Sequence, residues 1–184
     1  MKTIVFSFAR MNPPTTGHSR LISKVVEMAK ALSADHAIYL SQTQNEKTDP
    51  LDWNFKHRIC ESAFPGINFP KDVDIKTPFQ ALSLLALAED YEKIIFIVGS
   101  DRVDDFTERM TPYAEELPID FEIVSAGERI AESSSVEGMS ASKLRQYALD
   151  NNDEKFFEGL PNTMNMGIKK LVLKNTKKGM IPKR

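Results

Sequence analysis

The sequence contains one cysteine and eight glycines among 184 residues, and both scarcities exclude kinds of protein. Cys60 cannot form an internal disulfide, which is typical of a cytosolic protein, and we interpret it as a small buried apolar residue on a helix. The glycines are scattered, since no two of them lie closer than eight positions. The sequence therefore has neither a GxGxxG dinucleotide fingerprint nor a GxxxxGKS/T phosphate loop.

Long apolar runs and a signal-peptide cleavage pattern are missing as well. The longest strongly apolar stretches have about the length of a strand, so we expect no membrane span. With 41% hydrophobic, 27% charged and 9% aromatic residues, the composition is typical of a globular protein that buries a core without disulfides. We expect a cytoplasmic protein with one main domain over residues 1–150 and a helical basic extension over residues 151–184.

Acidic residues are absent from residues 166–184, although the whole chain has a net charge of −2. This segment carries seven basic residues, which leaves 17 basic and 26 acidic residues elsewhere. They are Lys169, Lys170, Lys174, Lys177, Lys178, Lys183 and Arg184. A basic tail on an acidic body is compatible with contact with nucleic acid or another polyanion. The alternative is a terminal helix with a solvated lysine face and a frayed end, and the tail lacks the aromatic residues of a single-strand binding surface.

Short apolar strands alternate along the chain with segments of helical periodicity. We expect strands at Lys2–Phe8, His36–Ser41, Val73–Lys76, Lys93–Val98 and Ile119–Val124. We expect helices at His18–Leu32, Leu51–Phe64, Phe79–Glu89, residues 102–116, Ser140–Leu149, from near Asp153, and at Asn165–Lys177. This order predicts an α/β fold with a Rossmann-like, open, doubly wound parallel sheet of five strands, helices on both faces and a short helical C-terminal extension. In such sheets ligands bind beyond the carboxyl ends of the strands.

The first chemically informative segment follows the first strand and ends at His18. It reads Ala9-Arg10-Met11-Asn12-Pro13-Pro14-Thr15-Thr16-Gly17-His18. His18 stands at a helix start, where free N–H groups and the helix dipole favour anions and a neutral imidazole that donates to a phosphate oxygen. Arg10 adds a forked cation for phosphate, and Gly17 allows the backbone to approach a ligand closely. The alternative is a capped helix start with Thr15 or Thr16 as the N-cap.

Two later segments carry further candidates. Met139-Ser140-Ala141-Ser142-Lys143-Leu144-Arg145 opens a helix whose hydroxyls and free N–H groups can hold phosphates, with Arg145 reaching back one turn to neutralise them. Its alternative is an N-cap Ser140 with an exposed Arg145. Ile97-Val98-Gly99-Ser100-Asp101-Arg102 ends the expected central strand. There Gly99 leaves room for a nucleotide. Asp101 can accept a hydrogen bond from a ribose hydroxyl or from a group of the acceptor substrate, and the alternative is a simple helix N-cap.

These segments resemble the motifs of the nucleotidylyltransferase superfamily, the HxGH group of adenylyl- and cytidylyltransferases. Thr15-Thr16-Gly17-His18 corresponds to its H/T-x-G-H motif, with threonine first as in phosphopantetheine adenylyltransferases. The spacing from Arg10 to His18 is similar to the GRFxPxHxGH form of the archaeal-type nicotinamide-mononucleotide branch, although Ala9 replaces its glycine. Met139–Arg145 matches the C-terminal motif at both hydroxyls, the apolar position and the arginine. The resemblance covers roughly residues 1–150.

Two further stretches are similar to nucleotidyltransferase-like proteins of large tailed phages. They are Asp49–Pro65 and Phe156–Pro161. For a phage-encoded protein, this resemblance implies action in the host cytoplasm.

The resemblance implies transfer of a nucleoside monophosphate to a phosphate-bearing acceptor with release of pyrophosphate. The Arg10–His18 spacing favours AMP from ATP as the donor group and nicotinamide mononucleotide as the acceptor. The implied catalytic residues are His18, Thr15, Arg10 and Arg145. The implied nucleotide-binding residues are Phe8, Ala9, Arg10, Gly17, His18, Gly99, Asp101, Ser140, Ser142 and Arg145. Mg²⁺ would bridge the NTP phosphates and keep several waters. Zinc is not expected, because the three histidines have no metal-ligand spacing.

Several alternatives stay open at this point. Lys47, Lys56 and Arg102 are candidates for contacting the acceptor or the phosphates, and the alternative for each lysine is an ordinary surface residue. The sequence does not fix the nucleotide base or the acceptor substrate, so a cytidylyltransferase or a phosphopantetheine-type adenylyltransferase is also compatible with it. A nucleotide- or nucleic-acid-binding protein that kept the fold and lost the chemistry would use the basic tail for docking. A homo-oligomer is compatible with the sequence.

Overall fold

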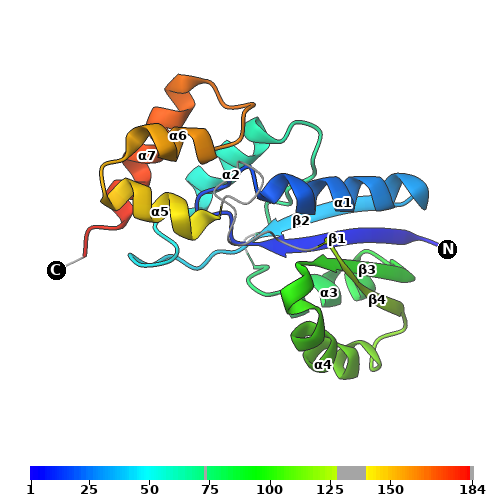
Figure 1. The fold of residues 1–184 in the computed structure, drawn as a ribbon. Coiled ribbons are helices and arrows are strands. Elements are labelled where there is room, and N and C mark those ends of the chain that lie inside the picture. The colour runs from blue at the N-terminus through cyan, green and yellow to red at the C-terminus, as the bar shows by residue number, and fades with distance from the viewer. Residues whose placement is uncertain (73, 128–139, 183–184) are drawn as a thin grey trace. The chain divides into compact units, whose positions relative to one another are not determined.

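The computed structural model describes residues 1–72, 74–127 and 140–182, which contain seven α-helices and one four-stranded sheet (Figure 1). The strands are β1 (Thr3–Ala9), β2 (Asp35–Leu40), β3 (Lys93–Val98) and β4 (Asp120–Ser125). They form a parallel sheet in the order β2-β1-β3-β4, with Ile4 opposite Ile94 and Ile94 opposite Phe121. The predicted Rossmann-like α/β fold is confirmed at this level.

The fifth expected strand, Val73–Lys76, is not formed by its described residues. Val73 lies outside the described residues, and residues 74–76 form a turn and a loop, in which the Ile75 amide donates to the Asp72 carbonyl. Ile75 is the one buried side chain among these three, and its neighbours are charged and exposed. A segment with one buried apolar side chain has too little apolar surface to pack into the sheet as the other strands do.

The helices agree with the expected ones apart from shifts at their ends. They are α1 (His18–Ala31), α2 (Trp53–Ala63), α3 (Pro78–Ser83), α4 (Val103–Ala114), α5 (Ala141–Leu149), α6 (Asp153–Gly159) and α7 (Met166–Gly179). Side chains cap several of them, since Asp52 accepts from two amides of α2 and Asn165 accepts from the Ile168 amide. The helix expected at Phe79–Glu89 instead divides into α3 and a π-helical turn, η1 (Leu84–Ala88). Within the described residues no helix is long and apolar enough to cross a membrane.

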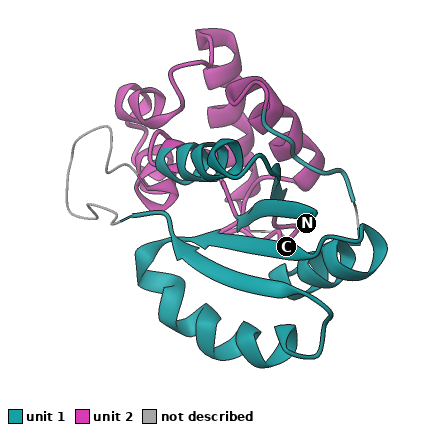
Figure 2. Ribbon diagram, turned by 90° about the vertical axis from the view of Figure 1, so that its right-hand side faces the viewer, with its two compact units in different colours: residues 1–9, 20–39, 67–129 teal, residues 10–19, 40–66, 130–184 magenta. Residues whose placement is uncertain are grey.

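The chain divides into two compact units, and each unit is assembled from three separate segments (Figure 2). Unit 1 consists of Met1–Ala9, Arg20–Tyr39 and Ile67–Arg129. Unit 2 consists of Arg10–Ser19, Leu40–Gly66 and Ile130–Arg184. The division into a main domain over residues 1–150 and an extension over residues 151–184 remains a prediction.

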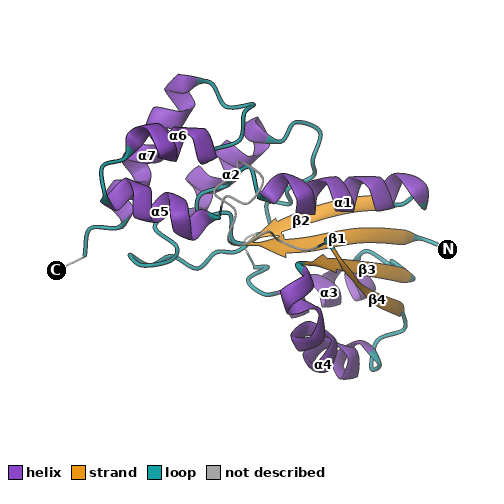
Figure 3. Cartoon of the chain, in the orientation of Figure 1, coloured by secondary structure: helices purple, strands orange, loops and turns teal. Residues whose placement is uncertain are grey.

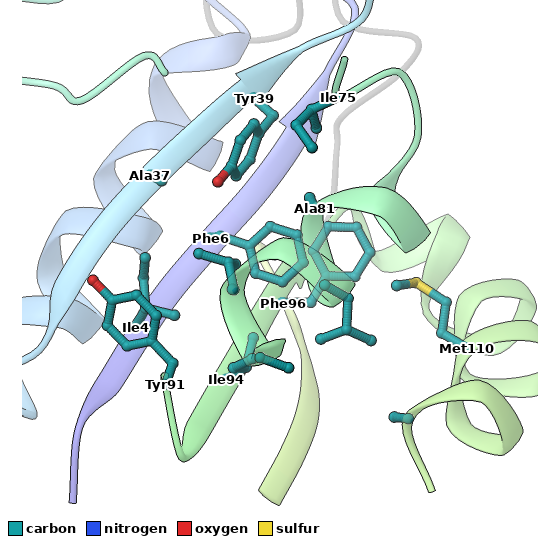
Figure 4. Close-up of a cluster of buried hydrophobic side chains, with 14 of the residues drawn as sticks. Ile4, Phe6, Ala37, Tyr39, Ile75, Ala81, Tyr91, Ile94, Phe96 and Met110 are labelled. Carbon is teal, nitrogen blue, oxygen red and sulfur yellow. The ribbon is translucent and has the colours of Figure 1, made fainter. Parts of the chain in front are cut away.

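Unit 1 has a sheet with helices on both faces (Figure 3). Because side chains alternate along a strand, Phe6 and Phe96 point to one face, where their rings stack with centroids 4.6 Å apart (Figure 4). This face packs against α3 and α4, which contribute Leu82 and Met110 to the same buried cluster. On the opposite face α1 buries the apolar side chains Ile22, Val25 and Ala29. The apolar run Ile94–Val98 is thus buried on both faces, as the sequence predicts.

Unit 2 is helical and has its own apolar core. This core contains Leu51, Ile59, Ala63, Leu144, Ala148, Phe156, Leu160, Met164, Val172 and Leu173. The side chains come from α2, α5, α6 and α7, so α7 is an integral part of the core. Cys60 is buried on α2, as predicted, with its Sγ 3.7 Å from Met11 Sδ. Burial raises the pKa of its thiol to about 12, which keeps it in the thiol form at neutral pH.

The last residue of α7 packs directly on the backbone of Pro50. A Cβ atom at Gly179 would lie 1.9 Å from the Pro50 carbonyl oxygen and 2.6 Å from its carbonyl carbon. Backbone atoms cannot rotate away as a side chain does, so only glycine fits here without a shift of α7 or of the 49–51 segment.

We expect Gly179→Ala to destabilise the protein by about 1–3 kcal/mol, the usual cost of forcing extra volume into a packed contact. Urea unfolding of the variant and the wild type measures this free energy. The matched control is Gly167→Ala in the same helix, where a Cβ atom would approach only the Asn165 side chain, at 3.3 Å. An unchanged unfolding midpoint in Gly179→Ala would contradict the close contact.

Candidate functional site

His18 is the first residue of α1, and its imidazole folds back onto the preceding loop in unit 2. The Thr15 backbone N–H donates to His18 Nδ1 at 2.9 Å, and the Thr15 hydroxyl oxygen lies 3.2 Å from the same nitrogen. Because Nδ1 accepts from an N–H group, it is unprotonated, and the proton of the neutral ring is on Nε2. His18 therefore presents Nε2–H as a hydrogen-bond donor, which is the form that binds a phosphate oxygen.

Thr15 holds this arrangement from a buried position, with 1% of its surface exposed. Its hydroxyl oxygen accepts from the Gly17 N–H at 3.1 Å, and its carbonyl oxygen accepts from the His18 N–H at 3.1 Å. The predicted roles of Thr15 as a helix cap and as a residue next to His18 are thus compatible. The same hydroxyl satisfies an amide of the helix entry and lies against the imidazole.

Lys56 is fully buried in α2, so its interpretation as an ordinary surface lysine is wrong. Its Nζ donates to the Ser41 carbonyl oxygen at 2.7 Å and lies 3.3 Å from the Ser41 hydroxyl. Burial lowers the pKa of Lys56 to about 8, and the nearby Arg10 lowers it further, whereas Cys60 and Asp49 oppose the shift. The ammonium has no carboxylate hydrogen-bonded to it among the described residues, and the two Ser41 oxygens are its hydrogen-bond partners.

Arg145 reaches the same loop from the second turn of α5. Its Nη1 donates to the Asn12 carbonyl oxygen at 2.9 Å, so the predicted alternative of a solvent-exposed arginine is wrong. Burial lowers its pKa, and the charges of Asp49 and Arg10 act on it as they act on Lys56. Lys56 and Arg145 thus each lie within the electrostatic reach of one cation, Arg10, and one carboxylate, Asp49. The local excess of positive charge favours a polyanion such as a nucleoside triphosphate.

Two buried polar atoms in this cluster have no hydrogen-bond partner within the described structure. Asn12 is 0% exposed and uses its Oδ1 to accept from the Leu51 N–H, which leaves Nδ2 unpaired. Asp49 is 1% exposed and accepts through Oδ2 from Thr48 and Asn45, which leaves Oδ1 unpaired. An unpaired buried polar group costs about 1–3 kcal/mol. Such groups concentrate at functional sites, where a ligand or ordered water completes them.

The second motif provides a capped helix start. The Ser140 hydroxyl accepts from the Lys143 N–H at 3.2 Å, so the N-cap alternative for Ser140 is confirmed. Ser142 is exposed in the first turn of α5, and Met139 lies outside the described residues. A Ser140 hydroxyl that accepts from its own helix keeps its O–H as a donor, so Ser140, Ser142 and Arg145 all stay predicted phosphate contacts of this motif.

The remaining nucleotide-binding candidates belong to unit 1. Phe8 packs partly buried against the unit 1 core, and Ala9 is buried at the end of β1. Asp101 stands within a 3₁₀ turn, η2 (Ser100–Arg102), rather than at a capping position. Its carboxylate oxygen lies 2.9 Å from where a Cβ atom of Gly99 would be, so Gly99 makes room for Asp101.

Arg102 and Lys47 have other surroundings. The Arg102 guanidinium lies over the Phe106 ring, 5.0 Å from its centroid. Lys47 is exposed, and its backbone N–H donates to Asn45 in the turn that precedes Asp49. Neither side chain joins the cluster around His18, Lys56 and Arg145 through a contact that the structure gives, so both remain candidates only.

Sequence reasoning missed Asn12, Asp49 and Ser41. The sequence indicates Asp49 only as the start of the stretch Asp49–Pro65 that resembles phage proteins, and Asn12 only as part of the first motif. Their importance arises from contacts between residues 15 to 133 positions apart, which no local pattern carries. In the described part of the chain no group of three or more His, Cys, Asp or Glu side chains could hold a metal ion.

The pKa of Lys56 predicts how stability depends on pH. The folded state loses the Lys56 proton near pH 8 and the unfolded state near 10.5, so between these values the unfolded state binds more protons and stability rises with pH. Below pH 8 the buried charge costs about 3 kcal/mol. From pH 7 to pH 9 the free energy of unfolding of the wild type should therefore rise by about 1 kcal/mol relative to that of Lys56→Met.

Urea unfolding of both proteins at several pH values in this range gives the difference directly. Taking the difference removes groups that titrate in both proteins, among them Tyr39 and Tyr91, whose pKa values burial raises. The exposed Lys30→Met serves as the control. Parallel stability curves for the wild type and Lys56→Met would show that Lys56 titrates as a solvated lysine.

A scan against protein-family models and a search of curated proteins found no match. Solved structures do match. A putative nicotinate-nucleotide adenylyltransferase from Vibrio parahaemolyticus matches with a TM-score of 0.58 and 14% identity, over 94% of this chain and 99% of that one. A bifunctional NMN adenylyltransferase/ADP ribose pyrophosphatase from Francisella tularensis matches with a TM-score of 0.62 and 11% identity, over 98% of this chain. TmcAL from Thermotoga maritima matches with a TM-score of 0.56 and 12% identity, over 97% of this chain.

The chain spans about half of the last two proteins, 53% and 56% of their lengths. Another structure of the Francisella protein holds AMP and a Mn ion, and another TmcAL structure holds alpha-thio ATP. At these identities the likeness concerns the fold. The matches run over nearly the whole chain, and the predicted resemblance is confirmed at that level: the chain has the Rossmann-like α/β fold of the nucleotidylyltransferase superfamily.

Proposed function

We propose that this protein is a nucleotidylyltransferase that transfers AMP from ATP to a phosphate-bearing acceptor, such as nicotinamide mononucleotide, and releases pyrophosphate. The observation that carries the proposal is the hydrogen bond from the Thr15 N–H to His18 Nδ1, which leaves Nε2–H as the donor at the start of α1. Arg10, Lys56 and Arg145, of which the last two feel the charges of both Arg10 and Asp49, supply the charge that a triphosphate requires. The ligands of the matching structures, AMP and alpha-thio ATP, are of the same chemical class.

In the proposed reaction an oxygen of the acceptor phosphate attacks the α-phosphorus of ATP in line. The new P–O bond forms as the bond to the β-phosphate breaks, and pyrophosphate leaves without a covalent enzyme intermediate. His18 Nε2–H donates to an α-phosphate oxygen and strengthens that bond as negative charge grows. Thr15 keeps the imidazole in place, and Arg10, Ser140, Ser142 and Arg145 bind the leaving pyrophosphate.

A divalent cation, Mg²⁺, would neutralise part of the triphosphate charge. The cationic cluster of unit 2 offers one carboxylate, Asp49, so the phosphates themselves would supply most of the oxygen ligands. The Mn ion in the AMP-bound Francisella structure supports a role for a divalent cation.

Pyrophosphate release is the experiment that tests the proposal. ATP and CTP, each with Mg²⁺, are paired with nicotinamide mononucleotide, phosphopantetheine, FMN and glycerol 3-phosphate, and His18→Ala is run beside the wild type. We expect release with ATP and one acceptor, and its loss in the variant. Release with CTP would replace the adenylyl assignment by a cytidylyl one. Silence of every pair, together with no thermal shift by either nucleotide, would overturn the proposal.

A further inference from the structure

Three lysines of α7 form an exposed row. Lys170, Lys174 and Lys178 recur every four residues, so they share one face of the helix at intervals of about 6 Å along its axis. All three are exposed, and none of their side chains has a hydrogen bond, ion pair or ring contact with another described residue. We call these three residues the lysine row.

The other lysines of the same helix are engaged, which sets the lysine row apart. Lys169 donates to the Phe157 carbonyl oxygen at 3.0 Å. Lys177 donates to Asn151 at 3.0 Å and lies 3.5 Å from the Asp153 carboxylate. The opposite face of α7 buries apolar side chains in the unit 2 core, so the row is presented by a fixed helix. The sequence allowed a frayed basic end, but the described part of this segment forms a packed helix up to Gly179.

A cavity of about 610 Å³ lies at the C-terminal end of the lysine row. Its lining residues are Gln44, Asn45, Glu46, Lys47, Lys178, Gly179, Ile181 and Pro182. Lys178 therefore belongs both to the row and to the cavity, and Lys47 adds a second cation, against one acid, Glu46. The contact of Gly179 with Pro50 holds this end of α7 in place. The volume is within the range of small-molecule pockets and suffices for one nucleoside.

We propose that this face binds a single strand of nucleic acid, with successive phosphates on the lysine row and one unpaired base in the cavity. Evenly repeated cations without counter-charges complement an evenly repeated anion. The cavity offers an apolar wall, Ile181 and Pro182, to the face of a base, and the Gln44 amide to its edge. A lipid surface fits less well, because charge predominates on this face: the three exposed lysines stand beside two exposed apolar side chains of the helix, Met166 and Leu171.

The lysine row and the cavity lining contain no aromatic side chain, which determines how binding should depend on sequence and on salt. Without stacking platforms, phosphate contacts supply most of the affinity, so binding is weakly dependent on sequence and strongly dependent on salt. Each phosphate contact to a single strand contributes about −0.7 to the slope of log K against log salt. Three contacts weaken binding roughly 20-fold between about 50 and 200 mM salt.

Fluorescence anisotropy with labelled oligothymidylate and oligouridylate tests the proposal on the full chain. We expect both strands to bind, and the variant K170Q/K174Q/K178Q to lose about 2 from the magnitude of the salt slope. The control K24Q/K30Q/K76Q makes the same change in net charge at lysines of unit 1 and should bind as the wild type does. An unchanged slope in the lysine-row variant, or an equal loss in the control, would overturn the assignment.

Three further probes separate the partners. An abasic strand of equal length should bind more weakly than oligothymidylate, and Gln44→Ala with Ile181→Ser should abolish that difference. A matched duplex can use only its phosphates, since its bases are paired, so Gln44→Ala with Ile181→Ser should bind it as the wild type does. Equal binding of the abasic strand and the base-bearing strand would remove the base from the proposal, and capture of anionic phospholipid vesicles in preference to the strands would replace nucleic acid by a membrane surface.

This inference stands apart from the proposed reaction. The lysine-row variant should release pyrophosphate from ATP and a small acceptor at the wild-type rate, because none of its three lysines belongs to the cluster around His18. Failure of the strand-binding experiment thus leaves the proposed activity intact, and failure of the pyrophosphate assay leaves the strand-binding surface intact.

Discussion

Replacing His18 with alanine should lower kcat for nucleotidyl transfer by roughly 10²–10³, the usual loss when one donor to a developing negative charge is removed. The Nε2–H bond strengthens as charge grows on the α-phosphate, so the loss is concentrated in kcat and the KM for ATP changes little. The fold should persist, because the imidazole of this partly exposed residue contributes to neither apolar core. Steady-state pyrophosphate release measures kcat and KM, and circular dichroism checks the fold.

A matched control is available in unit 1. His36 accepts from the Asn68 N–H through Nε2 at 3.1 Å, so His36→Ala also removes a hydrogen-bonded imidazole. It should leave kcat unchanged. His18→Asn, which keeps a side-chain N–H donor, should recover part of the lost rate. A His18→Ala enzyme with the wild-type kcat would remove His18 from the mechanism, whatever substrate the assay had identified.

Replacing Lys56 with methionine should raise the KM for ATP by about 10- to 100-fold, the equivalent of one charge-assisted interaction. Methionine keeps most of the buried volume and removes the charge that Ser41 holds in place. In the wild type, kcat/KM should also fall above pH 8, because the free protein loses the Lys56 proton there. That alkaline limb should be absent from the Lys56→Met profile.

A role of Lys56 in stability and a role in binding ATP can be distinguished. If Lys56 only supports the fold, the variant loses stability, and kcat/KM of the remaining folded protein keeps the wild-type pH profile. If Lys56 supplies charge to the triphosphate, the folded variant has a raised KM and a flat profile above pH 8. Lys56→Arg should restore affinity without restoring the alkaline limb, since an arginine stays protonated.

The sequence predicts strands and helices well where apolar residues follow one another in a continuous or periodic pattern. Ile94–Val98 is apolar at every position and belongs to β3, whereas residues 74–76, the described part of the expected Val73–Lys76 strand, have one buried side chain and form no strand. Thr15 and His18 could be found because the bond that joins them spans three residues. The structure thus confirms a local motif that the sequence contains in full.

The buried charge could not be predicted in the same way. On a helix wheel Lys56 is indistinguishable from a surface lysine, and its burial depends on a carbonyl oxygen 15 residues earlier. Asn12 and Arg145 meet across 133 residues, and Asp49 gains its place from the same folding of unit 2. Sequence periodicity reports which face of an element is apolar. It does not report which polar groups three separate segments bring together.

The interleaved segments of the two units have a consequence for the order in which the chain becomes structured during synthesis. Every segment of unit 1 precedes residue 130, so its sheet can close while the rest of the chain is still being made. Unit 2 cannot close so early, because half of its core side chains come from Phe156 to Leu173. Until α7 has left the ribosome, the loop around His18 and the Lys56 side chain lack part of the helical core that surrounds them. We therefore expect the sheet of unit 1 to form before the candidate site of unit 2.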